Sequence, residues 1–411
     1  MKQKKIVLTG GHMTPAMALI EVLNKHNWEI YYFGRTKAME QDKSLALEAE
    51  VIPKLGVKFL PLTSGRFRRK ITLRNLYSML KFPIGIVHAI LLLIKVKPDV
   101  VVSFGGYLGL PAVIAAWVLR IPIIIHEQIS VAGLANKLSG LFATKIAVTF
   151  PSSKQYYPKE KVVLTGNPIQ TGVFKTNKIV KKTYSPNFRN IKTIFVTGGN
   201  QGARDLNRLV LKALPELLKK YNVIHQIGST EAQDPEWEEA QNISLRRPEP
   251  IRSELFESEP QSRGPHGRRL VSGSKGIPKQ VRNDIMSSYY PVRFIPHEEM
   301  GSVYGLADLV VSRSGANTIS ELGALNKPAL VVPLEPSLMD EQLHNAKLLE
   351  NAGLAIMKHE DELTSDTLIN QTDEMFENLG EYKLKKEYEE VFVRDGAKRL
   401  YELVASVLED R

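Results

Sequence analysis

Two stretches of the sequence repeat one order of patterns, and this repetition constrains the fold more than any other feature. Each stretch has a short apolar run, then a Gly-Gly turn, then a helical pattern. The first runs from Ile6 to Gly10-Gly11, and the second runs from Thr193 to Gly198-Gly199. Further apolar runs separated by helical stretches follow both, which is typical of parallel sheets covered on both faces. These runs are 29–33, 100–104, 121–125 and 145–148 after the first turn, and 223–227, 309–311 and 329–332 after the second. The sequence therefore predicts an α/β protein with two doubly wound, Rossmann-like domains.

The length of 411 residues suits two such domains. We expect the first domain over 1–165, with a C-terminal helix within 386–411 crossing back to it, and the second over 166–385. Residues 244–282 are rich in Arg, Pro, Ser and Gly and lack an apolar period, so they are interpreted as a disordered insertion. A basic arm for a membrane or nucleic acid is the alternative interpretation of that segment.

Composition narrows the function classes. The chain has no cysteine, which excludes disulfides, thiolate zinc sites and cysteine nucleophiles. Its formal net charge of +11 suits anionic lipid, nucleic acid or a phosphorylated substrate. Zinc-finger, RNA-recognition and basic-zipper patterns are missing, so a nucleic-acid partner is not expected. The longest apolar run, Phe82 to Val96, is shorter than the ~20 residues of a membrane span and predicts a buried or surface-docking helix.

Both Gly-Gly turns lie between a strand and a helix, where unpaired N–H groups of the helix attract anions. The first turn leads into His12, and the pKa of histidine suits a general base. A structural role is the alternative for a lone histidine. The backbone N–H groups of the second turn, Gly198 to Gly202, could hold a diphosphate or a carbonyl. The alternative is a tight structural turn without a ligand.

A third loop follows the strand at Leu309. Ser314-Gly315-Ala316 forms a small-residue helix start that can face phosphates, and Glu321 can accept hydrogen bonds from two ribose hydroxyls. The alternative is a helix cap with a solvated glutamate. Gln342 and Asn345, after the next strand, either bind sugar hydroxyls or belong to an ordinary polar helix start.

Taken in order, these motifs resemble those of the MurG family of UDP-N-acetylglucosamine transferases. The resemblance covers nearly the whole chain except roughly 244–282. The matching residues are Thr9-Gly10-Gly11-His12, Gly105-Gly106-Tyr107 with Pro111, His126-Glu127-Gln128 with Gly133 and Asn136, Gly166-Asn167-Pro168, Gly198-Gly199 with Gln201-Gly202-Ala203, Arg313 to Glu321, and Gln342 with Asn345-Ala346.

The resemblance implies a GT-B fold and an inverting hexosyltransferase of peptidoglycan synthesis, peripheral to the cytoplasmic face of the cell membrane. UDP-N-acetylglucosamine would bind the second domain, and an undecaprenyl-pyrophosphoryl-linked acceptor the first. Neither a cofactor nor a metal is implied, since helix N-termini can stabilise the leaving diphosphate.

The resemblance also implies a set of site residues, with His12 as the base on the acceptor hydroxyl. Ile295 would lie against uracil. The implied donor contacts are Thr9, Gly10, Gly11, Gln170, Asn200, Gln201, Gly202, Ile295, Ala316, Asn317, Thr318, Glu321, Gln342 and Asn345. The implied acceptor side consists of Tyr107, Glu127, Gln128 and Ile129.

Cations and large apolar groups are mixed in the stretch that precedes the long apolar run. With the resemblance, they suggest docking on an anionic membrane. The alternative is a solvated basic loop that leads into a core helix. The residues expected to dock are Arg68, Arg69, Lys70, Lys81 and Phe82.

The sequence departs from the family pattern at several positions. Ile129 replaces an asparagine, Gln170 an arginine, Asn200 a serine, and Val7-Leu8 a Gly-Gly pair. Two alternatives therefore stand beside the transferase. One is another GT-B enzyme, such as a diacylglycerol glycosyltransferase or a UDP-N-acetylglucosamine 2-epimerase, although no set of cleft carboxylates for an epimerase is identified. The other is a catalytically weak UDP-sugar-binding scaffold.

Overall fold

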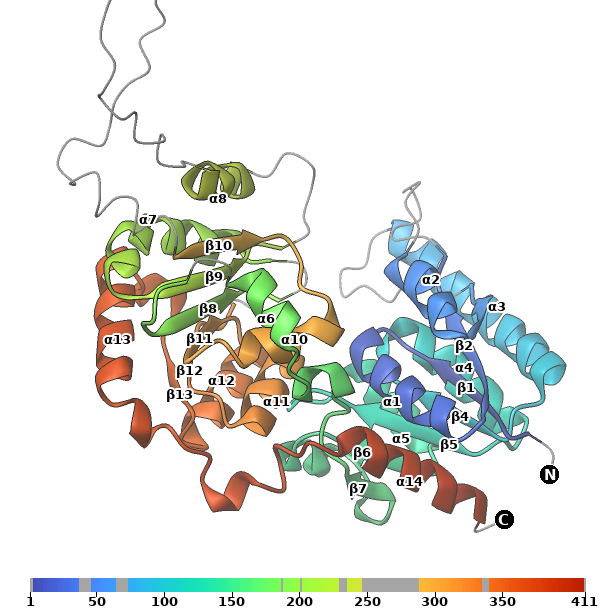
Figure 1. Ribbon diagram of the computed structural model, residues 1–411. Helices are drawn as coiled ribbons and strands as arrows, with labels where there is room; N and C mark the ends of the chain where they lie inside the picture. The colour runs from blue at the N-terminus through green and yellow to red at the C-terminus, as the bar shows by residue number, and fades with distance from the viewer. Residues whose placement is uncertain are drawn as a thin grey trace, which may run out of the picture.

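The computed structural model describes residues 3–36, 46–63, 73–185, 188–199, 202–228, 235–245, 288–334 and 340–409, with the backbone alone at 47, 73–81 and 245. These residues form two parallel sheets, each covered by helices on both faces and standing side by side (Figure 1). The predicted fold class is confirmed. Asn200, Gln201, Arg68, Arg69 and Lys70 lie outside the described residues, as does the predicted insertion beyond residue 245.

The first sheet has seven strands in the order β3-β2-β1-β4-β5-β6-β7. The strands are β1 (Lys5–Thr9), β2 (Glu29–Gly34), β3 (Lys58–Pro61), β4 (Val100–Ser103), β5 (Ile123–Glu127), β6 (Lys145–Val148) and β7 (Val162–Leu164). Its helices are α1 (Met13–Lys25), α2 (Leu47–Val51), α3 (Leu73–Val96), α4 (Gly106–Val118) and α5 (Leu134–Phe142). Helix α1 packs on one face, and α3 and α4 pack on the other.

The second sheet has six strands in the order β10-β9-β8-β11-β12-β13. The strands are β8 (Thr193–Thr197), β9 (Asn222–Gln226), β10 (Tyr289–Val292), β11 (Leu309–Ser312), β12 (Ala329–Val331) and β13 (Ala355–Met357). Its helices are α6 (Lys178–Tyr184), α7 (Arg204–Lys220), α8 (Pro235–Leu245), α10 (His297–Tyr304), α11 (Ala316–Leu325), α12 (Glu341–Asn351) and α13 (Ser365–Glu377). Helices α7 and α13 cover one face, while α10, α11 and α12 cover the other.

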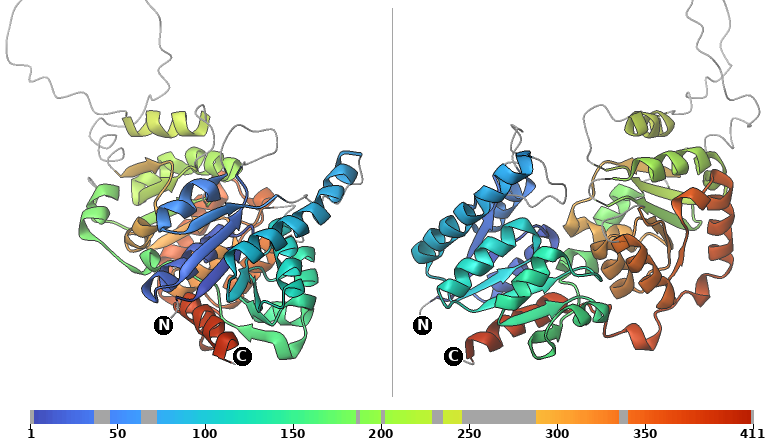
Figure 2. Two further views of the ribbon diagram at one scale, coloured as in Figure 1. Left: turned by 90° about the vertical axis from the view of Figure 1, so that its right-hand side faces the viewer. Right: turned by 180° about the vertical axis from the view of Figure 1, so that it is seen from behind.

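The chain crosses between the two sheets twice, and the crossing segments pack against each other. A Cβ added to Gly166 would lie 2.4 Å from the Val393 side chain, and one added to Gly396 would lie 2.4 Å from the Asn167 carbonyl oxygen. After the second crossing, α14 (Gly396–Glu409) packs on α1, where Leu400 joins the core of the first sheet (Figure 2). The two glycines therefore allow a close contact that ties the sheets together.

In each sheet the strand order reverses beside the strand that carries a Gly-Gly turn. The reversal lies between β1 and β4 in the first sheet and between β8 and β11 in the second. Open parallel sheets bind ligands outside the carboxyl ends of the strands at such switch points. The topology therefore brings the Gly10, Gly198 and Gly315 turns to the positions where a ligand is expected.

Candidate functional site

A cavity of about 340 Å³ lies between the carboxyl ends of the two sheets. The first domain supplies three of its lining residues, and the second supplies the rest. The lining residues are His12, Thr14, Gln128, Thr197, Gly198, Gly199, Gln226, His297, Met300, Tyr304, Gly315, Ala316, Asn317, Thr318, Glu321 and Glu341. Both switch points therefore open into one shared space.

The first turn is held rigidly beneath the cavity. Gly10 has a φ of +130°, and a Cβ added there would lie 2.7 Å from the backbone carbon of Phe104. The Tyr32 hydroxyl donates to the Gly10 carbonyl at 3.0 Å, and the Thr9 hydroxyl donates to the Phe33 carbonyl at 3.1 Å. Thr9 and Gly10 thus support the turn, and His12 and Thr14 are the residues that it presents to the cavity.

His12 has the neutral imidazole that a general base requires. Its imidazole is open to the cavity, yet the protein atoms around it lower its pKa below the usual 6.5 by desolvation. His126, behind it, is fully buried, and burial lowers its pKa to about 3. Both rings are neutral at pH 7, so His12 is free to accept a proton from a hydroxyl group.

The second turn is tight and is held against the start of α7. A Cβ added to Gly198 would lie 2.4 Å from the Ala203 nitrogen. The Gly199 N–H donates to the Thr197 hydroxyl at 3.0 Å, and the Gln226 side-chain amide donates to the Gly199 carbonyl at 3.1 Å. Gly198 and Gly199 therefore present backbone to the cavity, close to the N-terminus of α7.

The third turn begins α11, and Gly315 is the N-cap residue. The Ser314 hydroxyl donates to the Gln342 carbonyl at 2.7 Å, and the Asn345 side-chain amide donates to the Ser314 carbonyl at 3.0 Å. Gln342 and Asn345 therefore hold this turn in place and do not line the cavity. The first N–H groups of α11 give the turn a positive potential that suits an anion.

Glu321 is a buried carboxylate in the cavity wall. The Tyr304 hydroxyl donates to its Oε2 atom at 2.9 Å, and burial raises the Glu321 pKa to about 7. A carboxylate at this position can accept hydrogen bonds from a pair of neighbouring hydroxyl groups on a ligand.

Glu321→Gln is expected to stabilise the ligand-free protein at alkaline pH. Because the folded-state pKa of about 7 exceeds the usual 4.5, the stability linked to this group is full below pH 4.5 and is lost as pH rises through 7. The glutamine amide does not ionise, so the variant avoids this loss of folding stability, which amounts to ~3 kcal/mol at most. Urea unfolding at pH 5 and pH 8.5 checks this. An equal difference between variant and wild type at both pH values would contradict it.

Amide side chains join the domains at the cavity. The Gln128 amide donates to Asn317 Oδ1 at 2.5 Å, and the Asn167 amide donates to the same oxygen at 3.0 Å. Of the residues implied for the acceptor side, Gln128 is thus the one that meets the cavity. It does so in contact with Asn317 from the start of α11.

Glu127 and Ile129, also implied for the acceptor side, lie behind the cavity wall. Glu127 accepts from the Tyr157 hydroxyl at 2.7 Å and from the Asn136 amide at 3.1 Å, and burial raises its pKa. Ile129 packs into the apolar cluster of the second domain. Its side chain, which replaces a family asparagine, therefore makes an apolar contact between the domains.

Tyr107, the remaining residue implied for the acceptor side, lies in the first turn of α4 and is partly buried. Its neighbour Gly106 approaches the first turn, because a Cβ added to Gly106 would lie 3.2 Å from the Gly11 nitrogen. Neither Tyr107 nor Gly11 is a lining residue of the cavity.

Ile295, Gln170 and Gly202 are three further implied donor contacts that lie outside the cavity lining, besides Thr9, Gly10, Gly11, Gln342 and Asn345. The Ile295 side chain is 1% exposed and belongs to the domain core, and its backbone N–H already donates to the Gln226 side-chain oxygen at 3.2 Å. Gln170 donates to Glu21 of α1 at 3.1 Å. Gly202 has a φ of +79°, and a Cβ added there would lie 2.3 Å from the Ile227 carbonyl oxygen, so it serves the turn itself.

The structure adds lining residues that were not predicted from the sequence: Thr14, Thr197, Gln226, His297, Met300, Tyr304 and Glu341. His297, Met300 and Tyr304 are spaced i, i+3 and i+7 on one face of α10, a signal that the sequence contains. Glu341 precedes Gln342, and burial raises its pKa to about 7. The sequence motif thus identified the correct helix start, but the side chain that lines the cavity is that of Glu341 and not that of the predicted Gln342.

Part of the proposed docking segment can be placed. Lys81 and Phe82 belong to α3, and Phe82 is partly buried. Among the described residues, none of the helices is both long and apolar enough to cross a membrane. Within the same residues, no group of three or more His, Cys, Asp or Glu side chains is arranged to hold a metal ion.

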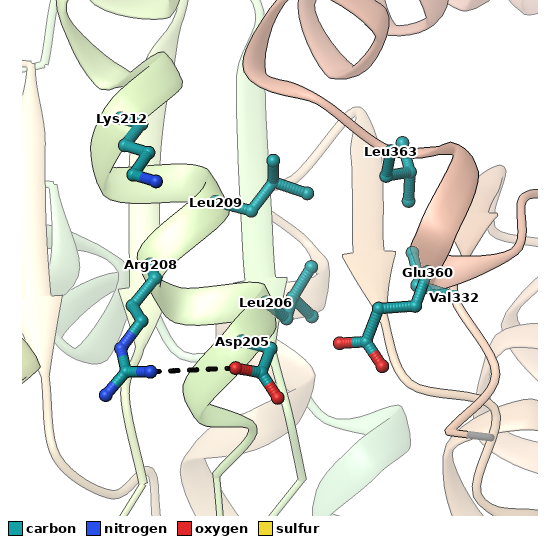
Figure 3. A pocket seen from close by; sticks show the side chains of 8 residues that line it. All are labelled: Asp205, Leu206, Arg208, Leu209, Lys212, Val332, Glu360 and Leu363. Atoms are coloured by element: carbon teal, nitrogen blue, oxygen red, sulfur yellow. Dashed lines mark ion pairs between the residues drawn. The ribbon is translucent and has the colours of Figure 1, made fainter. Parts of the chain in front are cut away.

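A second hollow of about 240 Å³ lies between α7 and the segments after β12 and β13 (Figure 3). Its carboxylates are already paired. Asp205 lies 3.7 Å from the Arg208 guanidinium, and Glu360 pairs with the buried Arg313. Because these charges satisfy one another, the interdomain cavity remains the better candidate site.

Comparisons with known proteins find matches to both domains. The model of the glycosyltransferase family 28 N-terminal domain matches residues 8–148, and that of the family 28 C-terminal domain matches 193–247 and 266–400. A Bacillus cereus protein named UDP-N-acetylglucosamine--N-acetylmuramyl-(pentapeptide) pyrophosphoryl-undecaprenol N-acetylglucosamine transferase 2 is 32% identical over 390 residues, 93% of this chain and 95% of that protein. A transferase with the same name apart from the final number, from Clostridium botulinum, is 31% identical over 384 residues, 92% and 93% of the two chains.

Solved structures share the fold. The crystal structure of Acinetobacter baumannii MurG aligns with a TM-score of 0.65 at 20% identity, covering 98% of this chain and 99% of that one. A UDP-GlcNAc 2-epimerase from Neisseria meningitidis, bound to UDP-GlcNAc, aligns with a TM-score of 0.60 at 14% identity, covering 98% of this chain and all of that one. At these identities the structural likeness bears on the fold alone.

Proposed function

The chain belongs to glycosyltransferase family 28, and from this premise we propose that it transfers N-acetylglucosamine from UDP-N-acetylglucosamine to a lipid-linked muramyl-peptide acceptor. The observation that carries the proposal is the composition of the interdomain cavity. The second domain contributes two glycine turns at helix N-termini and a buried carboxylate, and the first contributes a neutral histidine. Those groups match a nucleotide diphosphate, a ribose and an acceptor hydroxyl.

In the proposed mechanism, the turns at Gly199 and Gly315 hold the diphosphate, and Glu321 accepts hydrogen bonds from the ribose hydroxyls. His12 takes the proton from the acceptor hydroxyl as its oxygen attacks the anomeric carbon from the face opposite the diphosphate. The bond to UDP breaks, its electron pair stays on the diphosphate, and the configuration inverts. The α7 and α11 N-termini stabilise the leaving anion as its charge grows.

A transfer assay tests the function. The purified chain, supplied with labelled UDP-N-acetylglucosamine and a short-chain lipid-linked muramyl-pentapeptide, should form a labelled lipid-linked disaccharide. Conversion of the donor to its 2-epimer without transfer would favour the epimerase alternative. Binding of the donor without turnover on this acceptor or on diacylglycerol would favour the scaffold.

We also propose that α3 contacts an anionic membrane. Ile84, Val87, Leu91 and Ile94 recur at helical spacing on this helix and are each more than half exposed. The helix extends beyond the rest of the first domain (Figure 2, left). The helices α4 and α5 pack beside α3 in sequence order and also carry exposed apolar side chains, namely Trp117, Val118, Leu134, Leu138 and Leu141. Exposed apolar side chains that recur along one helix face mark an interaction site.

The double substitution Val87→Ser and Leu91→Ser is expected to lower binding to phosphatidylglycerol vesicles by about tenfold or more, since it removes apolar area from the contact. Vesicle sedimentation measures this. The control is Ile179→Ser on α6, which removes a side chain that is 77% exposed in the other domain and should leave binding unchanged. An equal loss of vesicle binding in the α3 variant and in Ile179→Ser, or no loss in either, would contradict an α3 contact.

A further inference from the structure

Helix α1 of the first domain meets the second domain at a point away from the cavity. His12 is the N-cap residue of this helix and lines the cavity. Glu21, further along α1, contacts residues 170–175, where the chain has crossed to the second domain (the crossing segment). At about 1.5 Å of rise per residue, His12 and Glu21 lie ~13 Å apart along the helix axis. A shift of α1 at Glu21 would therefore also move the His12 imidazole.

Glu21 holds the crossing segment by two hydrogen bonds. Its Oε2 atom accepts from the Thr171 N–H at 2.9 Å, and its Oε1 atom accepts from the Gln170 side-chain amide at 3.1 Å. Gln170 is buried, and its own Oε1 atom has no hydrogen-bond partner among the residues that the structure describes. Hydrogen bonds to an ionised carboxylate are stronger than those between neutral groups. One carboxylate of the first domain thus holds two successive residues of the crossing segment.

The crossing segment is packed tightly against α10 of the second domain. A Cβ added to Gly172 would lie 2.6 Å from the His297 carbonyl oxygen. One added to Gly301 would lie 2.3 Å from the Lys175 carbonyl oxygen. Both His297 and Gly301 belong to α10, so the two backbones touch at more than one point. The crossing segment therefore has to move together with α10.

Helix α10 is in turn a wall of the cavity, since His297, Met300 and Tyr304 line it. Its Tyr304 hydroxyl donates to Glu321, to which the proposed function assigns the ribose. Glu21 therefore links the helix that carries the base to the domain that holds the nucleotide. Glu21 itself is not a lining residue of the cavity.

We propose that Glu21 is a positioning residue for the transfer: it holds α1, and with it His12, at the place from which His12 reaches the acceptor hydroxyl. This rests on the proposed function, because it assumes that His12 serves a substrate pair bound across the cavity. A displacement of about 1 Å in a reacting group can lower a rate by ~10²-fold. Gln170, which stands where the family pattern has arginine, has its amide engaged in this contact between the domains.

Steady-state transfer kinetics and calorimetric titration with UDP, both on the full chain, test the proposal. Glu21→Ala removes both hydrogen bonds and should lower kcat by about tenfold or more. Its Kd for UDP should stay within about twofold of the wild type, because the proposed nucleotide contacts belong to the second domain. A side chain that served only the stability of the fold would not separate kcat from UDP binding in this way.

Glu21→Gln is the conservative variant and should restore kcat to within about threefold of the wild type. Its side-chain oxygen can still accept from the Thr171 N–H. Its amide can donate to the unpaired Oε1 atom of Gln170 once the Gln170 amide has turned over. Gln170→Ala should lower kcat in the wild type but have little further effect in Glu21→Ala, because the two side chains act through one contact.

Asn24→Ala is the matched control. Asn24 lies on the same helix, but its amide donates to the Leu55 carbonyl oxygen at 3.3 Å, within the first domain. Its removal should leave kcat and the affinity for UDP within about twofold of the wild type.

The outcomes separate this inference from the function on which it rests. Absence of transfer by the wild type would remove the proposed function itself. With an active wild type, a kcat of Glu21→Ala within twofold of it would overturn the role of Glu21 and leave the function standing. An equal loss of kcat in Glu21→Gln or in Asn24→Ala, or a matching loss of UDP affinity in Glu21→Ala, would overturn it too. Thermal unfolding checks that the variants are folded, and Glu21→Ser replaces the alanine variant if that one is not.

Discussion

Replacing His12 with alanine is expected to lower kcat for transfer by about 10²–10⁴, with the KM for UDP-N-acetylglucosamine changed by less than about threefold. His12 is open to the cavity at the start of α1, opposite the glycine turns of the second domain. Its lowered pKa keeps it neutral at pH 7, so it is ready to remove the acceptor proton. The loss should be confined to kcat, since the donor contacts lie on the other side of the cavity. Steady-state kinetics with both substrates varied measures it.

The control for this change is Thr14→Ala, which removes a neighbouring lining side chain that cannot act as a base. Its kcat should stay within about threefold of the wild type. In the wild type, kcat/KM should fall as pH drops through the His12 pKa, below 6.5, and should stay level above neutrality. If His12→Ala kept a tenth or more of the wild-type kcat, another group would have to be the base.

Gly315→Asp is expected to weaken UDP binding by about 100-fold or more without loss of stability. Gly315 is the N-cap of α11 with φ −64° and ψ 147°, and a Cβ added there meets nothing within 4 Å. Aspartate is one of the preferred residues at a helix N-cap, so the fold should tolerate the change. Its carboxylate, however, would enter the space assigned to the diphosphate and repel it. Titration calorimetry and thermal unfolding together measure the two effects.

Gly315→Asn is the matched control, because asparagine has the same shape and also caps helices, but carries no charge. It should weaken UDP by much less than aspartate does. Equal losses in the two variants would mean that the added volume, and not the charge, disturbs the site. Unchanged UDP binding in both would place the diphosphate somewhere else.

The central strands of both sheets could be predicted from the sequence, and the outermost strands could not. The predicted apolar runs include β1, β4, β5, β8 and β11, whose residues are almost wholly buried. The unpredicted strands are β3, β7, β10 and β13, which are the four edge strands of the two sheets. Edge strands are only partly covered, so their sequences need not be continuously apolar. The apolar pattern in the sequence is therefore weakest in the strands that are least buried.

The candidate site was predictable at the level of turns and much less so at the level of side chains. The glycine turns follow from local backbone requirements, which a sequence displays directly. Whether Gln342 or Glu341 faces the cavity depends on how α12 packs. Likewise, Ile295 is buried while His297, two residues later, lines the cavity. Such choices are made by packing between elements that are far apart in the chain.

A crystal structure of the chain with UDP-N-acetylglucosamine would place the ligand directly. The diphosphate should lie within hydrogen-bond distance of backbone N–H groups at Gly199 and at the start of α11, with the sugar turned towards His12. A nucleotide bound outside this interdomain cavity, or with its diphosphate away from both turns, would contradict the assignment.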